Sequence, residues 1–300
     1  METNRKDVIL DTDTANELDD QFALSYLLLN RERATTLAIT IAPFLNSKST
    51  SPKDGMLQSL EEANRLLELL GMEDMKPQVY PGAEAFLTDE HTPIISPASR
   101  KIAEEAVRHS PAHPLYIVAI GAGTNVASAF LMQPEAMKKN TVVIWLAGHG
   151  IHWVDSHEFN LFQDVAAGRI IFGSGANLVQ LPCMGVVDHF TVGKEELEHY
   201  LVGKNPLCDY LAGNVIAEME NRYGGKPWSR ILWDVTAVAW LFNDKERFMK
   251  SYPIPSPIPQ YDHHYSFSPN RPNITYVYHI RRDALFDDLY QKLTTYKSNS

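Results

Sequence analysis

Residues 7–24, DVILDTDTANELDDQFAL, place four carboxylates directly behind a short apolar run. Residues 8–10 are apolar without alternation and end in turn-forming polar residues, which predicts a buried strand. From Asp19 onward, apolar residues recur at helical spacing, so a helix is expected to follow. The acidic cluster therefore lies on a strand-to-helix turn, at the sheet edge where open α/β folds bind their ligands. Its members are Asp11, Asp13, Asp19 and Asp20.

Four carboxylates within ten residues repel one another unless a cation or shared protons hold them together. Ligands that are all oxygen favour a hard divalent ion, Ca²⁺ or Mg²⁺. The alternative is an exposed acidic loop in which Asp19 is the N-cap of the helix. The stretch thus predicts a cation site, with a purely structural acidic turn as the competing interpretation.

Strand-like runs alternate with amphipathic helical patterns for most of the chain. The further strands are expected at 35–43, 114–120, 141–147 and 177–182. The helices are expected at 57–70, 98–108, 125–132 and 165–173, and residues 194–242 look chiefly helical. This alternation predicts an α/β fold with a mostly parallel central sheet and helices on both faces. The sequence has no internal repeat and no Gly/Ser linker, so a single domain over residues 1–300 is expected.

The segment 251–273 carries six prolines in 23 residues and is expected to be a loop, because proline blocks both helix and ladder. It also carries His263 and His264. A long loop in a compact domain is often a lid or binding loop. An irregular surface connection is the alternative.

The bulk composition excludes several classes of function. The apolar content of 44% allows a substantial core, whereas a net charge of −10 argues against nucleic-acid binding. No apolar run approaches the roughly 20 residues of a membrane span. The opening METNRKDVIL lacks the apolar core of a secretory signal, and the distant Cys183 and Cys208 suggest a reducing compartment. A cytoplasmic location is therefore expected.

Four other places carry polar residues at predicted element ends. Thr124 lies in the glycine-rich turn of AIGAGTNVASAF (119–130), where it could cap a helix or offer a carbonyl to a ligand. Glu158 and Asn160 lie in HEFNLFQDVAAGRIIF (157–172), and such a pair suits hydrogen bonding to vicinal hydroxyls. Asp164 in the same segment is interpreted as a helix N-cap.

Asp234 opens an apolar helix in SRILWDVTAVAWLF (229–242), and it is either an N-cap or a fifth metal-directed carboxylate. Asn46, just past the second strand, is by itself a plain turn residue.

Taken in order along the chain, these motifs resemble the nucleoside hydrolase family, the calcium-dependent N-ribohydrolases, which have a Rossmann-like fold. The family opening is D-x-D-x-x-x-D-D, whereas residues 11–20 read D-T-D-T-A-N-E-L-D-D, with two extra residues before the paired aspartates. The resemblance implies hydrolysis of ribonucleosides to ribose and free base, with Ca²⁺ as cofactor and a homodimer or homotetramer as the assembly.

The resemblance also implies residue roles. Asp13 would be the general base and a calcium ligand, and Asp11 a supporting carboxylate. Further calcium ligands would be the carboxylates of Asp20 and Asp234 and the main-chain carbonyl of Thr124. The ribose hydroxyls would be held by Asp19, Asn46, Glu158 and Asn160.

This chain departs from the family pattern in two places. It has Trp233-Asp234 where relatives have His-Asp, and Ile151-His152 where they have Gly-Asn. Stabilisation of the leaving base then needs another group. Either Trp153 or Trp233 stacks on the base, or a histidine donates a proton, and His263 and His264 on the proline-rich loop are the preferred pair. The histidine candidates are His91, His149, His152, His263 and His264.

Two other functions remain open from the sequence. VILDTDT also fits the opening of haloacid dehalogenase-type phosphatases, with Asp11 as nucleophile, Asp13 as acid and Mg²⁺ as cofactor. Its late acidic pair would be Asp287-Asp288, which falls inside an amphipathic helix. The third possibility is a calcium-dependent nucleoside- or ribose-binding protein without turnover, although binding alone does not require the base Asp13.

Overall fold

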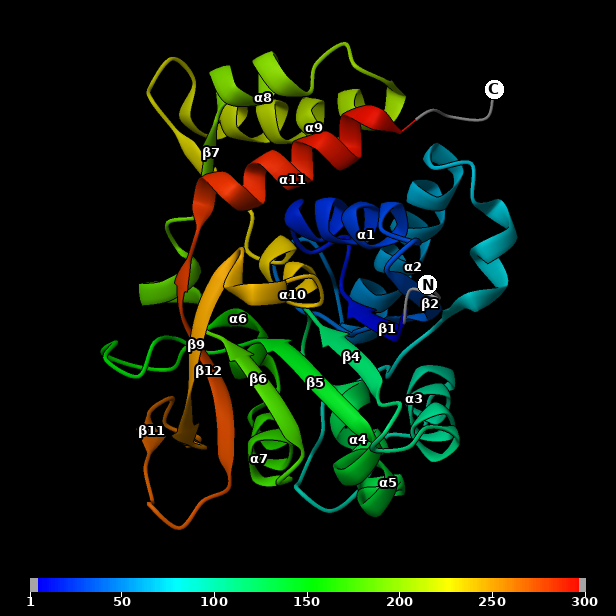
Figure 1. Ribbon diagram of the computed structural model, residues 1–300, viewed down its shortest axis with the longest axis vertical. Helices are drawn as coiled ribbons and strands as arrows, with labels where there is room; N and C mark the ends of the chain where they lie inside the picture. The colour runs from blue at the N-terminus through cyan, green and yellow to red at the C-terminus, as the bar shows by residue number, and fades with distance from the viewer. Residues whose placement is uncertain (1–4, 297–300) are drawn as a thin grey trace.

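The computed structural model describes residues 5–296 and contains an eight-stranded central sheet (Figure 1). The strand order is β3-β2-β1-β4-β5-β6-β12-β9, and every neighbouring pair is parallel except β12 and β9. The predicted α/β fold with a mostly parallel sheet is therefore confirmed. The strands are β1 (Lys6–Thr12), β2 (Ala34–Ile41), β3 (Val79–Tyr80), β4 (Leu115–Ala119), β5 (Thr141–Leu146), β6 (Asn177–Leu181), β9 (Met249–Pro255) and β12 (Asn273–Ile280).

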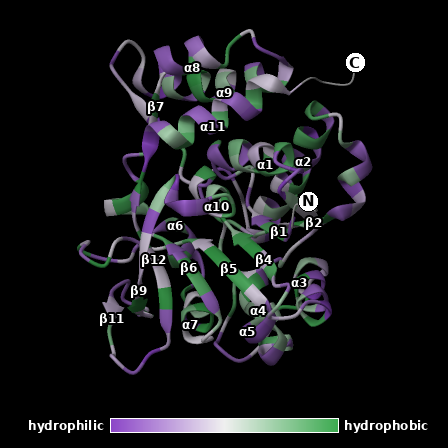
Figure 2. Cartoon of the chain, viewed as in Figure 1, coloured by the Kyte–Doolittle hydropathy of each residue, from purple (hydrophilic) through white to green (hydrophobic). Residues whose placement is uncertain are grey.

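Helices cover both faces of the sheet, because the central strands are apolar on both sides. In β1, Val8 and Leu10 pack into one core cluster and Ile9 packs into the other. Figure 2 shows the same pattern as mainly hydrophobic colouring on β4 and β5. The first cluster includes α1 (Asp19–Leu29), α2 (Pro52–Leu69), α8 (Lys194–Tyr200), α9 (Pro206–Tyr223), α10 (Val235–Trp240) and α11 (Arg282–Thr295). The second includes α3 (Pro97–Arg108), α4 (Thr124–Met132), α5 (Pro134–Asn140), α6 (Phe159–Gln163) and α7 (Val165–Gly173).

The strand order reverses between β1 and β4. From β1 the chain runs outward through β2 to β3, and it then returns to the other side of β1 and continues through β4, β5 and β6. Parallel sheets of this kind open a crevice at the reversal, outside the carboxyl ends of the strands. The acidic turn after β1 lies at that point.

The proline-rich segment is only partly the loop that the sequence predicted. Residues 249–255 form the outer strand β9, and β10 (Ile258–Pro259) pairs with β11 (Tyr265–Ser266) in a short hairpin. Pro253 and Pro255 stand opposite Thr275 and Asn273 of β12. Residues two apart in a strand direct their N–H groups toward the same edge. An outer strand tolerates prolines at such positions, because the edge that lacks these N–H groups has no neighbouring strand to bond.

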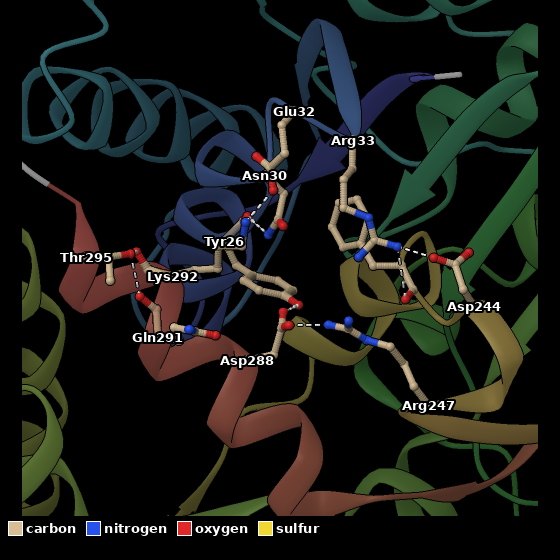
Figure 3. Close-up of polar contacts among 11 residues, drawn as sticks. Tyr26, Asn30, Glu32, Arg33, Asp244, Arg247, Asp288, Gln291, Lys292 and Thr295 are labelled. Carbon is tan, nitrogen blue, oxygen red and sulfur yellow. Dashed lines mark hydrogen bonds and ion pairs between the residues drawn. The ribbon is translucent and has the colours of Figure 1, made fainter. Parts of the chain in front are cut away.

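Helix α1, which carries Asp19 and Asp20, is anchored at its far side by polar contacts (Figure 3). The Tyr26 hydroxyl donates to Asp288 of α11, and Arg247 forms an ion pair with the same carboxylate. Two short elements complete the region around α8 and α10, the antiparallel strands β7 (Thr191–Gly193) and β8 (Ser229–Ile231). No helix within residues 5–296 is long and apolar enough to cross a membrane.

Candidate active site

A cavity of about 240 Å³ opens at the carboxyl ends of the central strands, at the reversal of strand order. Its walls come from the turn after β1, the ends of β4 and β5, and the segments that precede α6 and α10. The residues that line it are Asn16, Glu17, Asp19, Asp20, Asn46, Ile120, Leu146, His149, His157, Glu158, Phe159, Asn160, Cys183, Met184, Trp233 and Asp234.

Three carboxylates gather on one side of this cavity. Oxygen atoms of Asp19, Asp20 and Asp234 lie within 4.8 Å of one another, and all three residues are buried. The helices α1 and α10 pack together, and the Asp234 N–H donates to Asp19 Oδ2 at 3.2 Å. The predicted convergence of the opening motif with Asp234 is thus seen in the fold.

Asp13 lies behind this group with no partner for its charge. It is fully buried, and neither carboxylate oxygen has a hydrogen-bond partner among residues 5–296. Burial, with added repulsion from Asp20 and Asp19, raises the pKa of Asp13 well above its ordinary value. A buried carboxylate is costly without a compensating partner. Three carboxylates that converge beside such an orphan, all with oxygen donors, fit a hard divalent cation.

Asp20 and Asp234 also have a raised carboxyl pKa. Burial, reinforced by the charge of Asp19, raises the pKa of Asp20 to about 7, although the Thr12 hydroxyl donates to its Oδ1 at 2.5 Å. Burial and the neighbouring Asp19 raise the pKa of Asp234. A cation at this place would displace those protons, because metals bind deprotonated carboxylates.

Asp11 supports the site from inside the sheet, and it does not line the cavity. Its Oδ1 accepts from the Thr40 hydroxyl at 2.7 Å and from Asn125 Nδ2 at 2.9 Å. Burial raises the pKa of this carboxyl to about 7, and the two hydrogen bonds oppose the rise. These contacts tie β1 to β2 and to α4.

The capping interpretations have mixed outcomes. Asp164 does cap α7, since its side chain accepts from the Ala167 N–H. Asp19 is not the N-cap of α1; Leu18 holds that position, and Asp19 is the first helical residue. Asp234 occupies the N-cap position of α10 without a side-chain capping bond. Thr124 begins α4 and is buried outside the cavity lining, and its hydroxyl donates to Asp164 at 2.7 Å.

Glu158 and Asn160 also line the cavity, and both are extensively hydrogen-bonded. Glu158 accepts the N–H groups of Gly148 at 2.8 Å, Asn160 at 2.9 Å and Leu161 at 3.0 Å. Burial still raises the pKa of Glu158 to about 7. Asn160 Nδ2 donates to the carbonyls of Ile120 and Leu146, so its carbonyl oxygen is the group left to accept a ligand hydroxyl.

The predicted aromatic and histidine residues are only partly in the cavity. Trp233 lines it, and of the five candidate histidines only His149 does. His91, His152, His263, His264 and Trp153 lie outside the lining. The hypothesis that the proline-rich segment places two histidines over the cavity is therefore not supported. His263 instead packs edge-on against His157 at 4.4 Å, and His157, which the sequence analysis missed, does line the cavity.

Asn46 lines the cavity as expected, together with two residues that the sequence analysis passed over. Asn46 Nδ2 donates to Asn16 Oδ1 at 2.7 Å, and Glu17 follows Asn16 along the wall. Both lie in the turn that is two residues longer than the family motif, so the added length was the available signal. Arg230 was also missed, and its side chain forms ion pairs with Glu17 and Asp19.

Comparison with known proteins places the chain among nucleoside hydrolases. The family described as inosine-uridine preferring nucleoside hydrolase matches residues 8–286. The pyrimidine-specific ribonucleoside hydrolase RihA of Citrobacter koseri is 27% identical over 217 residues, which cover 65% of either protein. The non-specific ribonucleoside hydrolase RihC of Klebsiella pneumoniae is 29% identical over 191 residues, covering 58% of this chain and 60% of the relative.

Solved structures show the same fold over almost the whole chain. A plant nucleoside hydrolase superposes with a TM-score of 0.77 at 20% identity, over 97% of this chain and 99% of the other. A purine-preferring ribonucleoside hydrolase from Gardnerella vaginalis gives a TM-score of 0.71 at 20% identity, over 96% and 98% of the two chains. The match to the curated relatives thus spans about two thirds of their length, whereas the fold match is nearly complete.

Proposed function

This chain belongs to the inosine-uridine preferring nucleoside hydrolase family, and we propose that it hydrolyses the N-glycosidic bond of ribonucleosides to ribose and free base. The observation that carries the proposal is the unpartnered Asp13 carboxylate behind three converging carboxylates at the strand-order reversal. Family membership over residues 8–286 argues against the phosphatase interpretation of VILDTDT. Asp287-Asp288 also lies within α11, away from a loop that follows a strand.

We propose Ca²⁺ as the metal, held by the carboxylates of Asp13, Asp20 and Asp234 and by the main-chain carbonyl of Thr124. When bound, it would lower the pKa of a coordinated water and orient the ribose diol. The carboxylates of Asp19, Asp20 and Asp234 converge here, and together with Asp13 they offer only oxygen, which supports a hard ion.

Asp13 would act as the general base. It would take a proton from the water whose oxygen attacks C1′ of the ribose as the bond from C1′ to the base nitrogen breaks. The ribosyl group gains positive charge in such a transition state. The buried carboxylates around Asp13 would stabilise that charge, because they are fixed in place before the reaction begins.

The remaining cavity residues would bind the substrate. Asp19, Asn46, Glu158 and Asn160 would hold ribose hydroxyls, and Trp233 would stack on the base. His149 offers a hydrogen bond to the leaving base, because its Nδ1 accepts from the Met184 N–H and its proton is therefore on Nε2. Burial lowers the pKa of His149, which keeps this ring neutral near pH 7.

The test is release of free ribose from a panel of purine and pyrimidine ribonucleosides, with Ca²⁺ and with a chelator. We expect release that is lost on chelation and restored by added Ca²⁺. Calorimetric titration of the same nucleosides runs in parallel. Calcium-dependent binding without any ribose would overturn the proposal in favour of a binding protein.

A further inference from the structure

Arg230 is a buried cation next to a site built for another cation. It lies in β8, and 11% of its side chain is exposed. Its Nη2 donates to Glu17 Oε2 at 2.6 Å and to Asp19 Oδ1 at 3.4 Å, and Nη1 lies 4.0 Å from Glu218. A buried arginine needs such partners, because an unpaired charge in this environment is strongly destabilising.

The arginine gives Asp19 its second hydrogen bond. Oδ1 of that residue faces Arg230, and Oδ2 accepts from the Asp234 N–H at 3.2 Å. Asp13 lies in the same cluster with both oxygens free. The carboxylates at this site are those of Asp13, Asp19, Asp20 and Asp234. Asp19 differs from the other three because a guanidinium already neutralises its charge.

We propose that Arg230 is a positioning residue that keeps Asp19 off the metal ion and reserves it for a ribose hydroxyl. The inference rests on the proposed function. A carboxylate paired with a guanidinium attracts a metal ion less strongly, because its negative charge is already partly neutralised. The guanidinium and the metal ion are both positive, so they also repel each other when they bind the same carboxylate. It still has about four lone-pair sites, of which two are used, so it can accept from a hydroxyl.

The longer turn after β1 holds the arginine in place. Glu17, which makes the shorter of the two hydrogen bonds, lies in the turn that is two residues longer than the family motif. Its side chain is 44% exposed at the rim, and Arg230 bridges it to the buried Asp19. A planar guanidinium can span two carboxylates in this way, whereas an ammonium acts as a single point.

The test is Arg230→Gln, with two measurements expected to move in opposite directions. Freed Asp19 should turn onto the ion, so Ca²⁺ should bind about tenfold more tightly by calorimetry, about 1.4 kcal/mol. The KM for inosine should rise about tenfold, because the hydroxyl loses its oriented acceptor. A role in folding alone would weaken both, and Ca²⁺ affinity that is unchanged or weaker would overturn the proposal.

Two further variants distinguish a specific effect of Arg230 from a general loss of folding. Glu17→Gln/Arg230→Gln keeps the net charge and should show the same opposite changes. Arg230→Lys keeps the charge but bridges poorly, and it should fall between wild type and Arg230→Gln in both measurements. The matched control is Arg247→Gln, which breaks an ion pair on the far side of α1 and should alter neither (Figure 3).

The outcome remains interpretable if the proposed function fails. Should the wild-type protein release no ribose, the inosine dissociation constant from calorimetry replaces KM. Tighter Ca²⁺ with weaker inosine would still support the role of Arg230. Parallel weakening of both would overturn it, whatever the activity of the enzyme.

Discussion

Asp13 and Glu158 are two buried carboxylates, the first next to Asp20 and Asp19 and the second in the cavity lining, and their surroundings differ completely. Glu158 accepts three backbone N–H groups from its own chain, whereas Asp13 accepts none. Both have a raised pKa, chiefly through burial. The Glu158 carboxylate therefore has all its partners once the chain has folded, and we call this the complete side. The Asp13 carboxylate gains a partner only when a bound ligand supplies positive charge, and we call this the incomplete side.

The largest effect should come from the incomplete side. Asp13→Asn removes the proposed base, and we expect ribose release to fall by about 10²–10⁴-fold, the range of a lost general base. The metal-free variant should unfold at a temperature equal to or above that of wild type, because a buried amide costs less than a buried carboxylate. Initial rates and calorimetric melting measure the two. Substantial turnover in this variant would exclude Asp13 as the base.

The complete side should respond in the opposite way. Glu158→Gln replaces one of the two carboxylate oxygens by an NH2 group. One acceptor oxygen then remains for three backbone N–H donors, and the NH2 group faces a donor that it cannot accept from. We expect the free energy of unfolding to fall by about 1–3 kcal/mol, the cost of an unsatisfied buried group. Ca²⁺ affinity should stay unchanged. Urea denaturation and titration calorimetry measure these, and a loss of Ca²⁺ binding would show that the two sides are not independent.

The smallest effect is the dependence of the metal-free protein on pH. The carboxyls of Asp13, Asp20 and Asp234 have a pKa raised on folding, so the native state binds more protons than the unfolded chain. Its stability should therefore fall as pH rises from about 4, the ordinary pKa, through about 7, the value for Asp20.

Calcium should reverse this trend. Its affinity should rise several-fold between pH 6 and 8, because the ligands must lose their protons. Melting temperatures at pH 5, 7 and 8, with and without Ca²⁺, make the comparison. Equal Ca²⁺ affinity at pH 6 and pH 8 would contradict the protonation of the cluster.

Much of the fold could be predicted because its strands are apolar without interruption. The runs at 114–120 and 141–147 became β4 and β5, with small differences at their ends. The strands within the proline-rich segment were missed because proline density was weighed without proline spacing. Residues 253, 255, 257 and 259 alternate with other residue types, and the first two of these prolines lie in an outer strand.

The site was predictable where it is local in sequence. Asp13, Asp19 and Asp20 lie within eight residues, and the strand-to-helix turn brings them together. Arg230 lies 213 positions from Glu17, and neither residue type signals that contact. His157 escaped notice because its place in the wall depends on packing against Phe162 and His263.

The prolines of β9 also bear on how copies of this chain can associate. An outer strand with free N–H groups is a template on which a second molecule can add a strand. Pro253 and Pro255 remove two of those donors at one end of the sheet, and at the other end β3 has only two residues. Neither border favours end-to-end growth into fibrils. Association between copies of this protein is therefore expected through helices and loops, and not through strand addition at either border of the sheet.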